Sequence, residues 1–147
     1  MRHRNFVATF ALLAGLALAG PAAGEDAAAK NKGYPAVPLI STSTNIVGET
    51  IRYPTTGAAH VTAAIVTLGP GAKTIVHKHG VPLFAYILDG ELTVDYGSHG
   101  KRTYKKGQAF MEAMDVAHYG INMSVSPVRI LAVYMGAKGS KNVIVEK

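Results

Sequence analysis

The amino-acid sequence predicts an all-β protein, a single-domain double-stranded jelly roll. Short runs rich in β-branched and aromatic residues alternate with Gly, Pro and Asp along most of the chain. After residue 25, no apolar repeat of helical period is long enough to form a helix. The 147 residues suffice for one domain with a single core. Because the chain has no cysteine, neither disulfides nor thiolate ligands can support the fold.

The pattern predicts short strands joined by tight turns, a spacing that is typical of a β-sandwich or barrel. We expect the turns at residues 54–57, 69–71, 89–90, 97–100 and 106–107. We expect the strands near residues 47–53, 60–68, 73–79, 83–88, 91–96, 101–105, 108–112, 117–123 and 128–135.

The Asp89-Gly90 dipeptide predicts a hairpin. Asp-Gly between two apolar runs favours a type I′ turn, in which Gly takes a positive φ. This interpretation pairs the strand at 83–88 directly with the strand at 91–96.

Residues 1–24 have the pattern of a signal peptide. Arg2 and Arg4 precede an apolar run, which is too short to span a bilayer, and small residues follow it before Glu25. An uncleaved N-terminal anchor is the alternative. Cleavage before Glu25 predicts a secreted protein, in a bacterial periplasm, with no membrane span in the mature chain. We then expect a tether that becomes an edge strand at 25–44 and one domain at 45–147.

The charge distribution argues against nucleic acid as a partner. The chain carries a net charge of +6, and removal of residues 1–24 with their two arginines lowers this to +4. The basic residues are scattered, apart from a short cluster at 101–106, and no basic stripe with interleaved aromatic residues is present in the sequence.

Two histidines at i and i+2 suggest a metal site. In a strand, His77 and His79 would point to the same face about 7 Å apart along the chain, so their neutral imidazoles could converge on one ion. The stretch 107–122 supplies a third histidine, His118. His60 and His99 are expected to face solvent.

The two histidine stretches together resemble the paired signature of the cupin superfamily, over about residues 45–137. The spacing of the first motif is matched by Gly71, His77, His79 and Gly90, and that of the second by Gly107, His118 and Asn122. The sequence departs from the family at three positions: Leu83 stands where the first motif has Glu, and Ala113 and Asp115 replace Pro and Gly in the second.

The resemblance implies a jelly-roll (cupin) barrel that binds a divalent metal ion through His77, His79 and His118. Since Leu83 cannot coordinate a metal, we hypothesise that Glu112 on the neighbouring strand replaces the lost ligand. The alternative is a partly exposed Glu112 that bonds a local backbone amide or a lysine. The sequence does not decide whether the ion is Mn, Fe, Ni, Zn or Cu.

Two functions follow from the resemblance. The first is a metal-dependent enzyme, dioxygenase-like or isomerase-like, that acts on a small oxygen-containing molecule; Glu112 could then be a general base if it is not a ligand. The second is a non-catalytic module that binds a small ligand or a metal. The sequence does not decide between them, because it shows no second catalytic group with a secure role. The three histidines argue against an empty, purely structural barrel.

The resemblance also orients the strand at 83–88. If Leu83 faces the barrel interior, as in the family, then Ala85 and Ile87 face inward and the alternate residues Phe84, Tyr86 and Leu88 face outward. A strand that is apolar on both faces is normally covered on both. Either the N-terminal segment covers the outer face or a second subunit does, and we predict a homodimer packed through this sheet.

Overall fold

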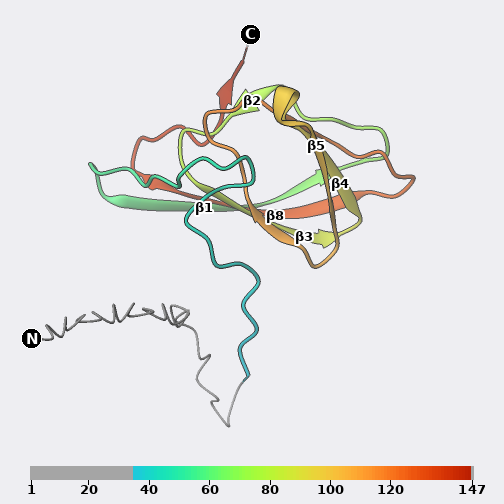
Figure 1. The fold of residues 1–147 in the computed structure, drawn as a ribbon, viewed down its shortest axis with the longest axis horizontal. Coiled ribbons are helices and arrows are strands. Elements are labelled where there is room, and N and C mark those ends of the chain that lie inside the picture. The colour runs from blue at the N-terminus through green and yellow to red at the C-terminus, as the bar shows by residue number, and fades with distance from the viewer. Residues whose placement is uncertain (1–34, 147) are drawn as a thin grey trace, which may run out of the picture. The chain divides into compact units, whose positions relative to one another are not determined.

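The computed structural model describes residues 35–146 (Figure 1). The predicted signal peptide and residues 25–34 of the predicted tether lie outside the described residues. Over the range described, the fold is all-β, with one short 3-10 helix, η1 (Gly97–His99), and no α-helix. In this range, no helix is long and apolar enough to cross a membrane.

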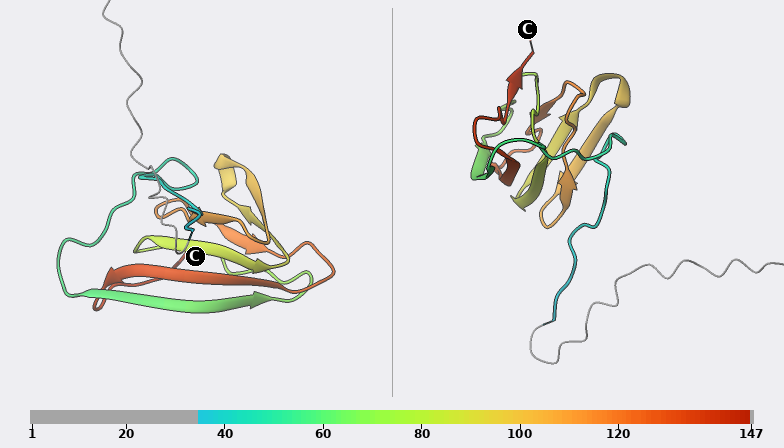
Figure 2. Two further views of the ribbon diagram at one scale, coloured as in Figure 1. Left: turned by 90° about the horizontal axis from the view of Figure 1, so that it is seen from below. Right: turned by 90° about the vertical axis from the view of Figure 1, so that its left-hand side faces the viewer.

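Most strands form two sheets that pack against each other as in a jelly roll (Figure 2). The first sheet has the order β1-β8-β3-β6, the second has the order β5-β4-β7, and β2 and β9 form a separate pair. The strands are β1 (Ala59–Leu68), β2 (His77–Lys78), β3 (Leu83–Asp89), β4 (Glu91–Asp95), β5 (Lys101–Lys105), β6 (Ala109–Met111), β7 (Tyr119–Ile121), β8 (Val128–Ala137) and β9 (Ile144–Val145).

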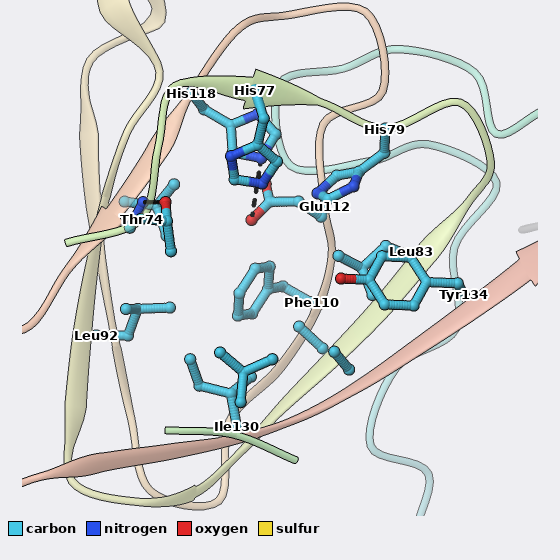
Figure 3. A pocket seen from close by; sticks show the side chains of 15 residues that line it. Thr74, His77, His79, Leu83, Leu92, Phe110, Glu112, His118, Ile130 and Tyr134 are labelled. Carbon is cyan, nitrogen blue, oxygen red and sulfur yellow. Dashed lines mark hydrogen bonds and ion pairs between the residues drawn. The ribbon is translucent and has the colours of Figure 1, made fainter. Parts of the chain in front are cut away.

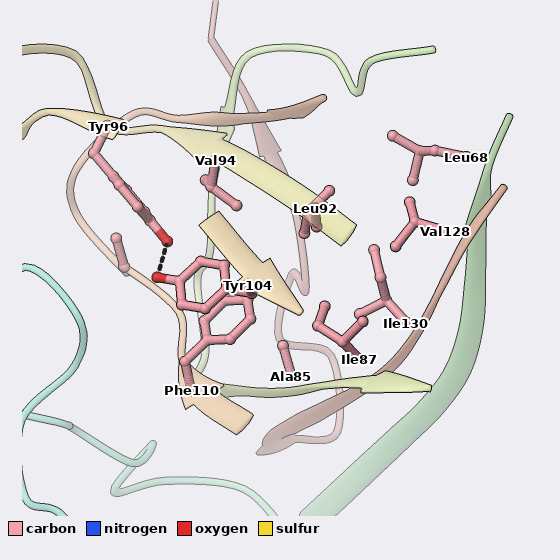
Figure 4. Packing of buried hydrophobic residues seen from close by; sticks show 11 residues of the cluster. Leu68, Ala85, Ile87, Leu92, Val94, Tyr96, Tyr104, Phe110, Val128 and Ile130 are labelled. Carbon is pink, nitrogen blue, oxygen red and sulfur yellow. Dashed lines mark hydrogen bonds between the residues drawn. The ribbon is translucent and has the colours of Figure 1, made fainter. Parts of the chain in front are cut away.

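The core lies between the two larger sheets (Figure 4). Ala85, Ile87 and Ile130 of the first sheet meet Leu92 and Val94 of the second. Apolar residues at alternate positions of a strand lie on one face of the sheet. When two sheets pack with these faces toward each other, both apolar faces are removed from water.

A buried aromatic group closes one end of this core. The ring of Tyr104 stacks on Phe110 with centroids 3.6 Å apart, and the hydroxyls of Tyr96 and Tyr104 are 3.1 Å apart. Each hydroxyl has the other as its hydrogen-bond partner, and a buried hydroxyl without a partner would be costly.

The predicted hairpin at Asp89-Gly90 is wrong. Strand β3 pairs with β8 and β6, whereas β4 pairs with β5 and β7. Gly90 does have a positive φ of 77°, but here the chain crosses from one sheet to the other. A Cβ on Gly90 would lie 2.7 Å from the carbonyl oxygen of Pro127, so a side chain does not fit there. Placing β3 and β4 in opposite sheets lets their apolar faces pack together, which a flat hairpin would prevent.

The strand predicted at 47–53 is also wrong, because this segment is a loop with one isolated bridge between Thr44 and Thr50. The side-chain oxygen of Asn45 accepts hydrogen bonds from the backbone N–H groups of Val47 and Glu49, and Gly48 has a positive φ of 90°. These local bonds favour a turn over a strand. The strand expected at 73–79 is shortened to β2, which pairs with β9.

The predicted sidedness of β3 is confirmed. Leu83, Ala85 and Ile87 are buried, and Phe84, Tyr86 and Leu88 alternate with them and are half-buried. The outer face of β3 is therefore apolar, as is its inner face.

Candidate metal centre

Backbone pairing brings the two histidine stretches together. His77 on β2 and His118, just before β7, form an antiparallel bridge with N–H···O distances of 2.9 and 3.0 Å in the two directions. His79 follows two residues after His77, and its N–H donates to the carbonyl of Met114 at 3.1 Å.

The three imidazole rings converge at one end of a cavity (Figure 3). Their centroids are 4.9 Å apart for His77 and His79, 4.7 Å for His77 and His118, and 5.1 Å for His79 and His118. Each ring offers one nitrogen, and these atoms all lie within 4.8 Å of one another. That spacing allows one metal ion to contact all three rings after small movements, because Zn–N bonds are about 2 Å long.

Backbone carbonyls fix the tautomer of each ring. The Nδ1 atom of His77 is 2.8 Å from the carbonyl oxygen of Ile75. The Nδ1 atom of His79 is 2.9 Å from the carbonyl oxygen of Asn142, and the Nδ1 atom of His118 is 2.8 Å from the carbonyl oxygen of Val116. A carbonyl oxygen can only accept, so each Nδ1 carries the proton and each Nε2 keeps a lone pair. Metal-binding histidines are typically oriented in this way.

Burial keeps the three rings neutral. Loss of hydration lowers the pKa of His79 to about 3, and it lowers the pKa of His77 and of His118 as well. A neutral imidazole is the form that binds a metal.

The Nε2 atom of His118 is buried and has no hydrogen-bond partner among the described residues. An unsatisfied buried nitrogen costs about 1–3 kcal/mol. A bound cation would remove this cost, so the donor set fits a divalent metal ion.

Glu112 lies beside the histidine group. Its side chain is buried, one oxygen accepts the Ala113 N–H at 2.8 Å, and the other is 3.9 Å from Nε2 of His118. Burial raises the pKa of Glu112 to about 7, although the Tyr96 hydroxyl and the Ala113 N–H partly offset this. Within residues 35–146, the three histidines have ligand atoms within 4.8 Å of one another, and Glu112 is not part of this group. Ligation by Glu112 therefore stays a prediction.

Leu83 lines the cavity, so an apolar side chain does occupy the position at which the first motif of the family has Glu. The cavity has a volume of about 80 Å³. Its polar lining residues are Thr74, His77, His79, Glu112, His118 and Tyr134, and its apolar ones are Val66, Leu83, Ala85, Leu92, Val94, Phe110, Gly120, Ile130 and Ala132.

Sequence reasoning missed Thr74 and Tyr134. Tyr134 follows Ile130 and Ala132 at the period of two residues that brings β8 side chains to one face, so this alternation could have identified it. The Thr74 hydroxyl is already used, because it donates to the carbonyl of Ile75 and accepts the N–H of Gly120.

Sequence reasoning also missed Glu49, which holds the loop after Glu112. Its carboxylate accepts the N–H groups of Met114 at 2.8 Å and Asp115 at 3.1 Å. Met114 in turn bonds His79, so the segment before β1 supports the site from outside the cavity.

The prediction that His60 and His99 face solvent is confirmed, because both residues are exposed. The buried amide of Asn122 donates to the carbonyls of Leu68 and Ser126 and therefore stabilises the loop after β7.

Fold and site together define a jelly-roll protein with a three-histidine group that could hold a metal ion. Residues 64–134 match the family model described as Cupin domain. Residues 64–134 therefore form a domain of the cupin superfamily.

Three solved structures are similar to parts of this chain, and the first of them supports the fold. The polyketide cyclase RemF from Streptomyces resistomycificus is 17% identical, with a TM-score of 0.52 over 68% of this chain and 69% of that chain. A sugar phosphate isomerase from a cupin superfamily, from Silicibacter pomeroyi, is 26% identical, with a TM-score of 0.44 over 50% of this chain. Oxalate decarboxylase from Bacillus subtilis, described with Mn(II) centres, is 26% identical, with a TM-score of 0.43 over 50% of this chain.

The aligned part spans about half the length of the isomerase chain (48%) and about a fifth of the decarboxylase chain (21%). A comparison with curated proteins gave no match.

Proposed function

We propose that this protein binds a divalent metal ion through His77, His79 and His118, with Glu112 as a further ligand, and acts on a small oxygen-containing molecule. The observation that carries the proposal is the convergence of three neutral imidazoles, each hydrogen-bonded at Nδ1 to a backbone carbonyl. At the point where they converge, Nε2 of His118 is buried and has no partner within residues 35–146.

Each residue has a distinct part in this proposal. A divalent ion bound by neutral histidines keeps its charge and acts as a Lewis acid toward a bound oxygen. The imidazoles hold their orientation through the backbone carbonyls, and Glu112 supplies one negative charge next to them. The apolar wall lowers the polarity of the rest of the cavity, which strengthens electrostatic interactions at the histidine end.

Metal analysis tests this proposal. Purified metal-free protein, offered Mn, Fe, Ni, Cu and Zn together, should take up close to one ion per chain and keep it through gel filtration. A protein that stays metal-free and equally stable would contradict the proposal.

The proposal includes export, which is supported by the pattern of residues 1–24. The mass of the protein recovered from a periplasmic extract should be that of a chain beginning at Glu25, and a full-length mass would contradict cleavage.

We also propose a homodimer through the outer face of the first sheet. Strand register places Val61 beside Met135, Ile65 beside Leu131 and Phe84 beside Val133, on the same face as Tyr86. Val61 is 60% exposed and Ile65 is 50% exposed, so this face has a contiguous apolar surface that is exposed to solvent. A second copy would cover it symmetrically.

Tyr86→Glu tests the dimer. A charge buried without a partner in this contact would cost several kcal/mol, so the variant should sediment as a monomer while the wild type sediments as a dimer. Val125→Glu is the matched control, because Val125 is 94% exposed in the loop before β8. A monomeric wild type would dispose of the proposal.

A further inference from the structure

The lining of the cavity is divided into a polar end and an apolar floor (Figure 3). The histidines and Glu112 lie at one end, and Leu92, Phe110 and Ile130 lie at the other. None of the described residues that line the cavity is a lysine or an arginine. The floor therefore offers no partner for a charged group, while the polar end has three imidazole nitrogens that could hold a metal ion.

Tyr134 adds one hydrogen-bond donor between these two regions. Its ring centroid is 5.7 Å from that of His79, and its hydroxyl points into the cavity in Figure 3. Among residues 35–146, no hydrogen bond to this hydroxyl is present, whereas the Thr74 hydroxyl already has two partners. The Tyr134 hydroxyl is thus available to a bound molecule.

The cavity volume limits the size of that molecule. The cavity measures about 80 Å³. One water needs roughly 10–15 Å³ on this scale, so a cavity of this size holds about five to eight non-hydrogen atoms.

We infer that the site takes a small molecule with one oxygen headgroup and an uncharged, apolar tail. This inference rests on the proposed metal site. The headgroup lies at the histidine end and accepts a hydrogen bond from the Tyr134 hydroxyl, and the tail packs on Leu92, Phe110 and Ile130. A second charge at the end of the tail would lose its hydration on this floor without a compensating partner, which makes its burial costly. Tyr134 is, in this account, a specificity-determining residue.

Three carboxylates that share a headgroup and have no more than eight non-hydrogen atoms test the inference: pentanoate, succinate and 5-aminopentanoate. Their tails end in a methyl group, a carboxylate and an ammonium, respectively. Each would be titrated into Co²⁺-loaded protein, with the visible absorption of Co²⁺ as the readout. Pentanoate should bind at least tenfold more tightly than the other two. Equal or tighter binding of succinate or 5-aminopentanoate would overturn the inference.

Tyr134→Phe keeps the ring beside His79 and removes the hydroxyl. Pentanoate affinity should fall about three- to tenfold, while Co²⁺ affinity, measured separately, stays unchanged. Unchanged pentanoate affinity would overturn the role of Tyr134. Wild-type protein that takes up no Co²⁺ would refute the proposed metal site and this inference with it, whereas uptake without selectivity for pentanoate would refute the inference alone.

Discussion

Replacing His118 by Ala should lower metal affinity by at least about 100-fold, since even residues that only support a ligand contribute 10–100-fold. His118 has the most enclosed ring of the three histidines, its Nδ1 is held by Val116, and its Nε2 has no partner in the described part of the chain. The variant removes one converging nitrogen and leaves the strands in place. Calorimetric titration with Zn²⁺ measures the change, and far-ultraviolet circular dichroism checks that the fold persists.

His77→Ala provides a second test, because His77 is only half-buried and its removal leaves a smaller void. It should weaken metal binding by a similar factor. His99→Ala is the matched control, since His99 is exposed on η1 away from the cavity lining. Wild-type affinity in both His118→Ala and His77→Ala would show that the ligand assignment is wrong.

Glu112→Gln should change metal preference. If the carboxylate is a ligand, it offsets one positive charge and favours harder ions such as Mn or Fe. The amide keeps the shape without the charge, so the variant should bind metal more weakly and prefer Zn or Cu. Leu83→Glu in the Glu112→Gln background places a carboxylate back at the position that is usual in the family and should shift the preference toward Mn or Fe. Identical selectivity in the wild type and both variants would leave the three histidines as the whole protein contribution.

Although Glu112→Gln should weaken metal binding, it should stabilise the fold of the metal-free protein. The folded-state pKa of Glu112 is about 7, above its ordinary value of 4.5, so the folded protein holds this proton to a higher pH than the unfolded chain does. Stability from this group is therefore lost as pH rises from about 4.5 through 7. At pH 8, Glu112→Gln should raise the free energy of unfolding of the metal-free protein by up to about 3 kcal/mol. At pH 4, where Glu112 is protonated in the folded state, the gain should vanish, and an equal gain at both values would contradict the assigned pKa.

Local spacing predicted the histidine group. Two of the histidines lie on one side of a strand and the third lies in a second short motif, so the prediction required little information about the rest of the fold. The sheet partners of β3 and β4 did not follow from local spacing. The Asp89-Gly90 signal describes a turn, but the partners of the flanking strands lie elsewhere in the chain: β3 pairs with β6 and β8, and β4 pairs with β5 and β7.

The contacts that hold the site residues in place also come from distant parts of the sequence. The carbonyl that orients His79 belongs to Asn142, and the carboxylate that holds Met114 belongs to Glu49. Neither residue is near its partner in the sequence, and a local pattern cannot indicate such contacts. Tyr134 is different, since the alternation along β8 would have placed it on the inner face.

The most direct test of the central claim is anomalous diffraction from crystals of the protein loaded with Zn²⁺, recorded on both sides of the zinc absorption edge. We expect one anomalous peak at the histidine end of the cavity, about 2 Å from Nε2 of His77, His79 and His118. A peak elsewhere on the chain, or an empty histidine group in zinc-loaded crystals, would contradict it.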